Sequence, residues 1–545
     1  MKHLFLASAM GVALAATAPA LAQHAGMNMP MPAPTKTVPH GAGAAHAHRP
    51  IARSKGRSRP VAQTRHGSAS RPAASPPPSS HPGHDMTGMS PGRPMPMAAA
   101  PQSGSTEPMP MPEPNRAAPP ATDRVMDRQD MPGMAPPADA SGGLAPMDHQ
   151  AMGHGGMNHA MTAALGAYPM TREASGTAWQ PDASIHGGVE TMRGGWMLMG
   201  HALLNGVYDR QGGPRGNAKA FVSGMLMGVA QRPFANGSVL QLKAMVSPDP
   251  LMGKSGYPLL LASGETADGT NPLVDRQHPH DLFMELSASY SLRLGDKASA
   301  FLYGGLPGEP AFGPPAFMHR MSILDSPEAP ISHHWLDSTH IIFGVVTAGL
   351  VYDKFKLEAS RFHGREPDQH RFDIETGALD STALRVSWNP TAELALQASW
   401  AYLKSPEQLE PATNQTRWSA SAIYTRRLGA NGWWSTTAAW GRRSSDGDNL
   451  DAWVLESALG LGDWTLFGRG ERTKNNELLF VGGRHGPAYH VGKASLGAIR
   501  DFRLAGHVKV GLGGLYAFNF VPAPLEPFYS GDPRGAMAFV RLKID

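Results

Sequence analysis

The stretch "DLFMELSASYSLRL" (residues 281–294) decides the fold of this chain. Every second residue is apolar, and these residues are Leu282, Met284, Leu286, Ala288, Tyr290, Leu292 and Leu294. The residues between them are mostly polar, namely Glu285, Ser287, Ser289, Ser291 and Arg293. Because successive side chains of a β-strand point to opposite faces, this stretch predicts a strand with one apolar face and one polar face.

The same alternation recurs at 239–246 and 354–360, and from about residue 190 onward the chain is a series of such segments separated by turn residues. Segments of roughly ten residues with this pattern are typical of a transmembrane β-barrel. We expect about 16 antiparallel strands, within a range of 12 to 18. Their predicted bounds are 193–207, 218–231, 237–248, 281–294, 297–306, 340–351, 353–362, 379–389, 392–403, 416–427, 432–443, 450–460, 463–472, 488–501, 504–518 and 534–545.

The connections between these segments alternate between short and long. An even strand count with strictly alternating connections is typical of an outer-membrane barrel, with tight turns in the periplasm and long loops outside. The predicted long connections are 208–217, 249–280, 307–339, 363–378, 404–415, 444–449, 473–487 and 519–533. Aromatic residues flank the short turns as an interfacial girdle would, namely Tyr352, Phe355, Trp388, Tyr424, Trp433, Trp434, Trp464 and Phe502. The predicted fold class is all-β, an outer-membrane β-barrel preceded by a long disordered segment.

The N-terminal part predicts export. Residues 1–22 combine a basic start, a short apolar run and Ala20-Leu21-Ala22, which together indicate a signal peptide cleaved before Gln23. No later stretch has 18 consecutive apolar residues, so no helical anchor is expected. The predicted domains are a tail at 23–170, a linker at 171–192 and the barrel at 193–545. The expected location is the outer membrane of a Gram-negative bacterium, with the tail in the periplasm.

The tail is rich in Pro, Gly, Ala and Ser and poor in β-branched and aromatic residues, which predicts disorder. Sixteen of the 30 methionines and ten of the 24 histidines lie between residues 23 and 165, and the chain has no cysteine. Thioethers suit Cu(I) or Ag(I), and imidazole suits Cu(I), Cu(II) and other late first-row metals. The alternative is a low-complexity spacer without function. The candidate ligands in the tail are His81, His84, Met86, Met89, Met147, His149, Met152, His154, Met157, His159 and Met161.

A second candidate site lies in the barrel. The motif "DRQHPHD" (275–281) closes one long loop, and the 34-residue segment 307–340, rich in proline and apolar residues, is expected to fold into the lumen as a constriction. Three interpretations stay open: a metal site, a hydrogen-bonded latch that holds the loop to the wall, and a porin-like eyelet of opposed charges. The residues in question are Asp275, His278, His280, Asp281, His319, His333, His334, Asp337 and His340.

The Met/His-rich tail with "MDHQAM" (147–152), placed before a barrel, resembles the outer-membrane copper-resistance protein B family. That resemblance implies copper sequestration or efflux, and it implies metal ligands at Met147, His149, Met152, His154, Met157, His159 and Met161. The barrel itself resembles uncharacterised outer-membrane proteins through "LVDRQHPHDLFMEL", "GEPAFGPPAFMHR" and "HHWLDSTHI". No activity can be transferred from that second group.

The expected function is metal homeostasis, with copper as the ion, Cu(I) favoured and silver as a second candidate. The alternative is a general or substrate-selective porin with a functionless tail. The expected partners are outer-membrane lipid, metal ions and periplasmic copper-handling proteins, and the oligomeric state stays open, a trimer included. Catalysis is not expected, because Ser338 and His340 lie two apart on a strand and cannot form a hydrogen-bonded triad. Nucleic-acid binding is not expected either, because the basic residues are dispersed despite a pI near 9.1.

Overall fold

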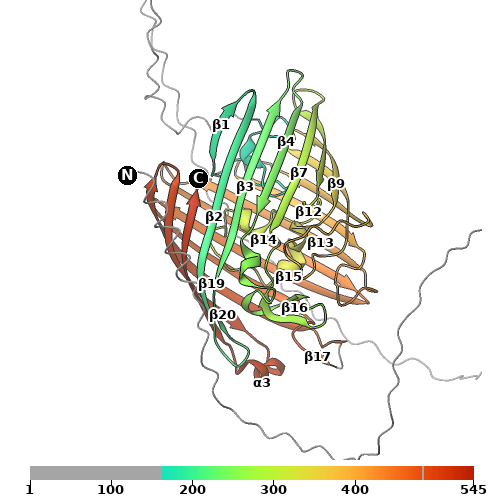
Figure 1. Ribbon diagram of the computed structural model, residues 1–545, viewed down its shortest axis with the longest axis vertical. Coiled ribbons are helices and arrows are strands. Elements are labelled where there is room, and N and C mark those ends of the chain that lie inside the picture. Colours follow the sequence, from blue (N-terminus) through green and yellow to red (C-terminus); the bar gives the residue numbers. More distant parts are fainter. Residues whose placement is uncertain (1–161, 186, 482–483) are drawn as a thin grey trace, which may run out of the picture. The chain divides into compact units, whose positions relative to one another are not determined.

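The computed structural model describes residues 162–185, 187–481 and 484–545. These residues form a closed, tilted barrel of antiparallel strands that surrounds several inward-folded segments (Figure 1). The chain is an outer-membrane β-barrel, as the alternating segments predict. The predicted signal peptide and all tail ligands up to Met161 lie outside the described residues, so they stay predictions.

All sixteen predicted barrel strands are present. Most of their bounds agree with the predicted ones to within a few residues; the largest difference is at the start of the strand predicted at 340, which begins at Val345. The strands are β2 (Trp196–Gln211), β3 (Ala218–Pro233), β4 (Val239–Val246), β7 (Phe283–Arg293), β8 (Ala298–Gly305), β9 (Val345–Tyr352), β10 (Phe355–Phe362), β11 (Ser381–Trp388), β12 (Leu394–Leu403), β13 (Gln415–Arg427), β14 (Gly432–Ser445), β15 (Asp448–Leu461), β16 (Trp464–Asn475), β19 (Tyr489–Ala505), β20 (Val508–Phe520) and β21 (Arg534–Ile544).

Each barrel strand pairs with its neighbours along the chain, and β21 pairs with β2 to close the ring. The last pair of this closing seam joins Ala202 to Ile544. Beyond that point a short extra strand, β1 (Val189–Arg193), takes over the same edge of β2, with Val189 opposite Gly200. Both edges of the sheet are therefore covered, which removes the unpaired backbone groups that a bilayer would not solvate.

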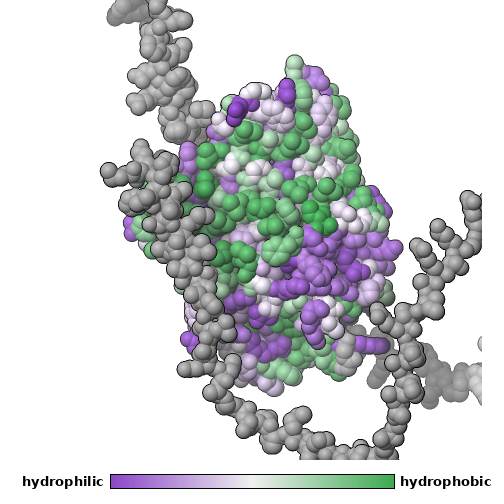
Figure 2. Space-filling view, in the orientation of Figure 1, coloured by the Kyte–Doolittle hydropathy of each residue, from purple (hydrophilic) through white to green (hydrophobic). Residues whose placement is uncertain are grey.

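The two faces of the strands divide as predicted. Along β10, Leu357 is 54% exposed on the outside, whereas Lys356 and Glu358 are each 1% exposed inside the lumen. Figure 2 shows the resulting apolar outer surface over β2, β3, β4 and β7. Two predicted positions are wrong. A register shift between β4 and β7 turns Met284 inward, where it is buried, and Trp433 lines the lumen rather than the girdle.

The connections also alternate as predicted, with one exception. The connection predicted as long at 444–449 is a two-residue turn, Asp446-Gly447, between β14 and β15. Both residues have positive φ, 48° and 89°. That conformation matches the twist of a tight hairpin, which explains why paired strands extend to this point.

Three segments fold into the lumen. The first is 162–185, which contains η2 (Met170–Arg172); the second is 247–282, which contains η3 (Asp249–Met252), β5 (Tyr257–Thr266) and β6 (Pro272–Gln277); the third is 306–344, which contains η4 (Phe317–His319), α2 (His333–Leu336) and η5 (Ser338–His340). The remaining elements lie in the long connections after β16 and β20, and they are β17 (Phe480–Val481), β18 (Arg484–His485), η6 (Ala523–Leu525) and α3 (Glu526–Tyr529). Within the described ranges, no helix is long and apolar enough to cross a bilayer.

The first segment corrects the predicted domain bounds. The sequence predicts residues 162–170 as the end of the tail and 171–185 as part of a linker, but both are held by the inner wall. The carbonyl of Ala164 accepts a hydrogen bond from Ser291 Oγ at 2.7 Å, and the carbonyl of Leu165 accepts one from Ser299 Oγ at 2.7 Å. Tyr168 and Trp179 pack edge to face, with ring centroids 5.0 Å apart. These aromatic side chains give the segment a core that its composition as a whole did not predict.

Candidate metal sites in the barrel lumen

Five histidines from two inward-folded segments converge in the lumen. His278 and His280 follow β6 in the motif DRQHPHD, His333 and His334 begin α2, and His340 ends η5. All five side chains are buried. Five of the six histidines that were expected to converge therefore do so.

Two glycines make room for this arrangement. A Cβ at Gly264 on β5 would lie 2.6 Å from the imidazole of His334, and a Cβ at Gly441 on β14 would lie 2.4 Å from the carbonyl oxygen of Trp335. Both distances are shorter than real contacts allow, so any larger residue would displace α2. The two glycines thus fix α2 against the wall and against the hairpin β5–β6.

The imidazole rings lie within a few ångströms of one another. The ring centroids of His280 and His340 are 5.1 Å apart, and those of His333 and His340 are 5.2 Å apart. His334 lies 5.6 Å from His333 and 5.7 Å from His278. The ring of Phe317 packs against His333 at 5.7 Å and closes one side of the cluster.

In four of these rings, Nδ1 faces an oxygen atom of a carboxylate or a carbonyl group. Nδ1 of His280 lies 2.8 Å from Asp249 Oδ2, Nδ1 of His333 lies 2.8 Å from Asp337 Oδ1, and Nδ1 of His340 lies 2.7 Å from the Asp337 carbonyl. Nδ1 of His334 lies 3.6 Å from Glu366 Oε2. Among the described residues, Nε2 of each of these four rings is buried without a hydrogen-bond partner.

His278 differs from the other four. Its Nε2 lies 3.2 Å from Glu265 Oε1, at ion-pair distance but without hydrogen-bond geometry. Arg371 in turn pairs with Glu265 and, at 3.2 Å, with Asp281. Burial lowers the pKa of His278 well below its usual value, and Arg371 lowers it further. Burial also raises the pKa of Glu265 to about 7.

The electrostatics favour neutral imidazoles at His278, His333 and His340. Burial lowers the pKa of His333, and burial with the neighbouring His280 lowers the pKa of His340 well below its usual value. Burial also lowers the pKa of His334, but the nearby carboxylate of Glu366 has the larger effect, so the pKa of His334 is raised overall. Neutral imidazole is the form that binds a metal ion.

Asp337 anchors the cluster to the wall through Arg320. Arg320 Nη1 lies 2.6 Å from Asp337 Oδ2, and its Nη2 lies 2.6 Å from Glu456 Oε1 on β15. Burial acts to raise the pKa of Asp337, but Arg320 and His333 outweigh it and hold the pKa below its usual value. Asp337 is therefore an ionised orienting group rather than a spare ligand.

Three other predicted residues do not belong to the group of five rings. Asp275 accepts a hydrogen bond from Tyr529 at 2.9 Å and pairs with Arg215 at 2.5 Å. Asp281 pairs with Arg371, and burial raises its pKa to about 6. His319 lies in a separate cavity, toward the side of the lumen that holds 162–185.

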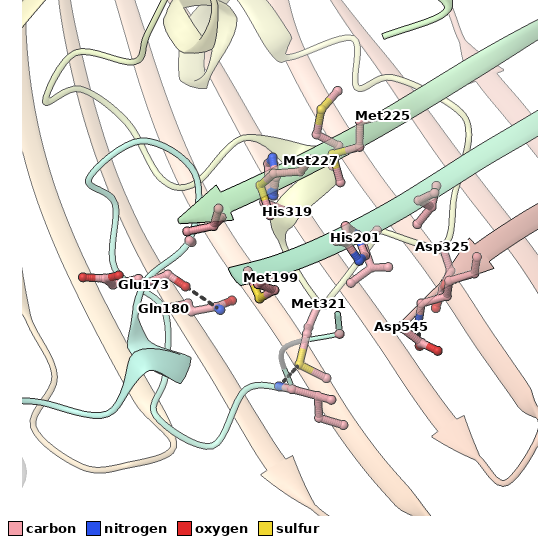
Figure 3. A pocket seen from close by; sticks show the side chains of 18 of the residues that line it. Glu173, Gln180, Met199, His201, Met225, Met227, His319, Met321, Asp325 and Asp545 are labelled. Atoms are coloured by element: carbon pink, nitrogen blue, oxygen red, sulfur yellow. Dashed lines mark hydrogen bonds and ion pairs between the residues drawn. The ribbon is translucent and has the colours of Figure 1, made fainter. Parts of the chain in front are cut away.

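That separate cavity has a volume of about 220 Å³ and is lined by methionine and histidine side chains (Figure 3). Met199 and His201 come from β2, Met225 and Met227 from β3, and Met170, Met318, His319 and Met321 from the inward-folded segments. The backbone N–H of Ile185 donates to the sulfur of Met321 at 3.0 Å. Charged side chains complete the lining, among them Glu173, Lys243, Asp325, Asp501, Lys509, Lys543 and Asp545.

Two carboxylate-containing groups in the described residues have ligand atoms within 4.8 Å of one another, Glu407–Glu477–His485 and Asp368–Asp373–Glu375. Arg443 pairs with both carboxylates of the first group, which accounts for it as an ion-pair network. The second group lies on the partly exposed loop 363–380. The five-histidine cluster is not among these tight groups, so ligation by three rings requires the imidazoles to rotate inward.

The comparisons with known proteins add little to this picture. No family model matches the sequence, and no curated protein matches it. Three similar solved structures are OmpT of Vibrio cholerae, the anion-selective porin from Comamonas acidovorans, and Salmonella typhi OmpF in complex with daunomycin. In that order, their sequence identities to this chain are 9%, 10% and 11%. The alignments cover 65%, 64% and 65% of this chain and 100% of each of the other chains, and the TM-scores are 0.37, 0.38 and 0.43. The assignment of the fold therefore rests on the strand pairing.

Sequence reasoning missed the oxygen partners Asp249, Glu265 and Glu366, because none of them lies in a histidine motif. It also missed the methionine-lined cavity. A signal was available in "WMLMGH" (196–201) and "MLMG" (225–228), where methionine and histidine stand two apart on a strand. Two-residue spacing places these side chains on one face, and that face is the lumen.

Proposed function

We propose that this outer-membrane barrel binds late transition-metal ions in its lumen, with copper as the principal ion. The observation that supports this proposal is the five-histidine cluster, in which four rings present a buried Nε2 without a partner in the described chain. Their Nδ1 atoms face carboxylates or a carbonyl. A metal-bound histidine is held in this way, through the nitrogen that does not bind the metal.

A latch that only holds the loop to the wall does not explain these free nitrogens. Leaving a buried polar atom unpaired costs about 1–3 kcal/mol. Other buried side chains of the described lumen also carry unpaired atoms, but in this cluster four of them come from adjacent imidazole rings, with centroids 5.1, 5.2 and 5.6 Å apart. The loop is already fixed by other contacts, such as Ser322 Oγ to Thr437 Oγ1 at 2.7 Å and Ser332 Oγ to Glu471 Oε1 at 2.7 Å. The imidazoles are therefore available for a ligand.

The donor set favours copper. Imidazole suits Cu(II), Zn(II) and Ni(II), and the general order of affinities places Cu(II) first. The Met/His tail adds donors that suit Cu(I) and Ag(I), so the same chain offers ligands for both oxidation states of copper. The resemblance of the Met/His tail to the outer-membrane copper-resistance protein B family also implies copper sequestration or efflux.

The orientation of the barrel fits capture of metal from the periplasm. The segment 162–185 contacts short turns, where Arg172 donates to the carbonyl of Asp353 and Asn389 donates to the carbonyl of Gln180. Short turns face the periplasm in outer-membrane barrels. The tail that precedes this segment would then lie in the periplasm.

The test is metal retention by the full chain. The protein is loaded with Cu(II) or Zn(II), passed over a chelating resin that removes exposed ions, and analysed for bound metal. We expect about one ion per chain to be retained, and we expect His333→Gln with His340→Gln to abolish retention. Glutamine keeps an N–H donor for Asp337 but offers no imidazole nitrogen.

The matched control is His363→Gln with His507→Gln, two histidines outside the cluster, which should retain metal as the wild type does. If the first pair does not fold, His278→Gln with His334→Gln removes two other rings. Equal retention in all folded variants would mean that the cluster is a structural latch and would reject the proposal.

A passive porin is the second candidate function. It is favoured by the closed barrel of sixteen strands with a long loop folded inward, which is how porins build a constriction. Metal-independent conductance in planar bilayers, unchanged by the histidine substitutions, would favour this alternative.

A further inference from the structure

The inner wall of this barrel is unusually apolar at one place. Barrel lumens are generally lined by polar side chains, yet the inner faces of β2 and β3 carry Met199, Met225 and Met227. Of the twelve methionines after residue 165, eight gather around this wall, and they are Met170, Met199, Met225, Met227, Met245, Met284, Met318 and Met321.

The strand register places the sulfur and imidazole donors side by side. His201 on β2 is directly opposite Met227 on β3, and Met227 is directly opposite Met245 on β4. Directly opposite residues have Cβ atoms about 5 Å apart. Figure 3 shows Met225, Met227 and His319 on one side of the cavity and Met199, His201 and Met321 on the other.

Core packing accounts for only part of this group. Met245 and Met284 are buried in a cluster with Ile341 and Phe343, as core residues are. Met225 belongs to the same cluster, and Met227 and Met318 pack against it, but these three residues and Met199 also border an open volume of about 220 Å³. Barrel lumens often hold water, so the feature that points to a ligand is not the volume but the set of thioether and imidazole donors that border it.

The location of the cavity connects it to the Met/His tail. Met170 and Glu173, on the first inward-folded segment, line it directly. The carbonyl of Thr162 accepts a hydrogen bond from Gln231 Nε2 on β3 at 3.0 Å, in the same strand as Met225 and Met227. The chain therefore passes from the tail onto the wall that carries the cavity.

We propose that this cavity binds a soft monovalent cation, Cu(I) or Ag(I), through the thioethers of Met199, Met225, Met227 and Met318 with an imidazole from His201 or His319. Thioethers are neutral, polarizable donors that select such ions over divalent hard ones. The inference deepens the proposed metal function by giving the lumen two sites of different chemistry, one thioether-rich beside 162–185 and one imidazole-rich in the long loops.

The test replaces sulfur without changing volume. Leucine is close to methionine in size and apolarity, so Met→Leu exchanges usually cost less than about 1.5 kcal/mol. The variant carries Met199→Leu, Met225→Leu, Met227→Leu and Met318→Leu in the full chain. The control carries Met252→Leu and Met537→Leu, which are buried but do not line the cavity.

The measurement is an Ag(I) titration of the detergent-solubilised full chain labelled with 13C-methyl methionine. The four cavity resonances are identified as those absent from the quadruple variant. We expect them to shift on Ag(I) addition. We expect the Ag(I) affinity of this site to fall by more than about 100-fold in the quadruple variant, because loss of a single outer-shell partner of a ligand already costs about 10- to 100-fold. The control should respond as the wild type does.

Two outcomes would overturn the inference. Either the four resonances stay fixed while other methionine resonances shift, or the quadruple variant retains as much Ag(I) per chain as the control. A two-residue variant, Met199→Leu with Met227→Leu, serves if the quadruple variant does not fold. Failure here is separable from failure of the proposed function, because Cu(II) or Zn(II) retention by the histidine cluster is measured independently.

Discussion

Arg320 is the residue on which the inward-folded loop most depends. Its guanidinium is 1% exposed and joins Asp337 of the loop to Glu456 of the wall, with a further hydrogen bond of 2.8 Å to the carbonyl of Pro315. Removing one partner of a buried ion pair leaves a buried charge uncompensated. The same residue therefore sets both the position of the loop and the orientation of His333 through Asp337.

We expect Arg320→Met to destabilise the loop by about 3–5 kcal/mol, the usual cost of breaking a buried ion pair. Hydrogen exchange of residues 306–344 in the detergent-solubilised chain measures this directly. Arg293→Met is the control, because Arg293 pairs with Asp296 at a surface where that carboxylate is 97% exposed, and such pairs contribute little. Equal exchange in both variants would show that other contacts hold the loop.

Glu309 makes the loop sensitive to pH. Burial raises its pKa from 4.5 to about 7, against the opposing effect of Arg385. A raised carboxyl pKa means that the folded state prefers the protonated form, so its stabilising contribution is complete below about pH 4.5 and is lost as the pH rises through about 7. The loss would reach about 3 kcal/mol, at 1.36 kcal/mol per pKa unit.

We expect Glu309→Gln to raise the thermal unfolding midpoint at pH 8 and to flatten its decline between about pH 5 and 8. Unfolding midpoints across that range test this in the detergent-solubilised chain. Glu190→Gln, on exposed β1, should follow the wild-type profile. A variant as pH-dependent as the wild type would show that Glu309 is not the responsible group.

Several site residues could be predicted from sequence, because the apolar residues of the loops that carry them indicate that these loops fold inward. A 34-residue loop with buried apolar side chains had to fold inward, and the histidines inside it had to meet those of DRQHPHD. The orienting partners Asp249 and Glu366 could not be predicted, because they come from unrelated loops. The cavity methionines could not be predicted from alternation alone, because an inward methionine on one strand is indistinguishable from a packing residue until the register of the neighbouring strands is known.

At the scale of elements, strands were predicted well because their signal is local. Period-two alternation determines which face of a strand contacts the bilayer, and charged side chains on that face are strongly destabilising. Two of the failures, Met284 and the turn at 446–447, arise from backbone geometry. A register shift and a pair of positive φ angles change the path of the chain without changing its hydrophobic pattern.

The inward-folded segments were harder to delimit than the strands. The tail and the segment 162–185 share a low-complexity composition, yet Tyr168 and Trp179 with Arg172 form a small core against the wall. Two aromatic residues among 24 residues that are mostly small or polar change the average composition of the segment little. They are enough, however, to bury the segment once a lumen surrounds it.

At the scale of the whole molecule, the proposed metal sites form a series from the tail through the cavity to the histidine cluster. The tail offers thioethers and imidazoles, the cavity beside 162–185 offers thioethers, and the long-loop cluster offers imidazoles. Ions could therefore pass between sites of graded softness without meeting a thiolate, since the chain has no cysteine. Each group can be removed separately, which makes the order testable in cells.

We expect cells that carry the chain without residues 24–160 to lose copper and silver tolerance relative to cells with the full chain, because capture by the tail is the first step.

The cavity variant with four Met→Leu exchanges should lose silver tolerance more than Cu(II) tolerance, since only thioethers are removed. The pair His333→Gln and His340→Gln should show the reverse, and His363→Gln with His507→Gln should match the full chain. Growth at graded metal concentrations, with periplasmic metal content, measures each effect. Identical tolerance in every strain, including one without the protein, would reject the metal function and leave the porin function in its place.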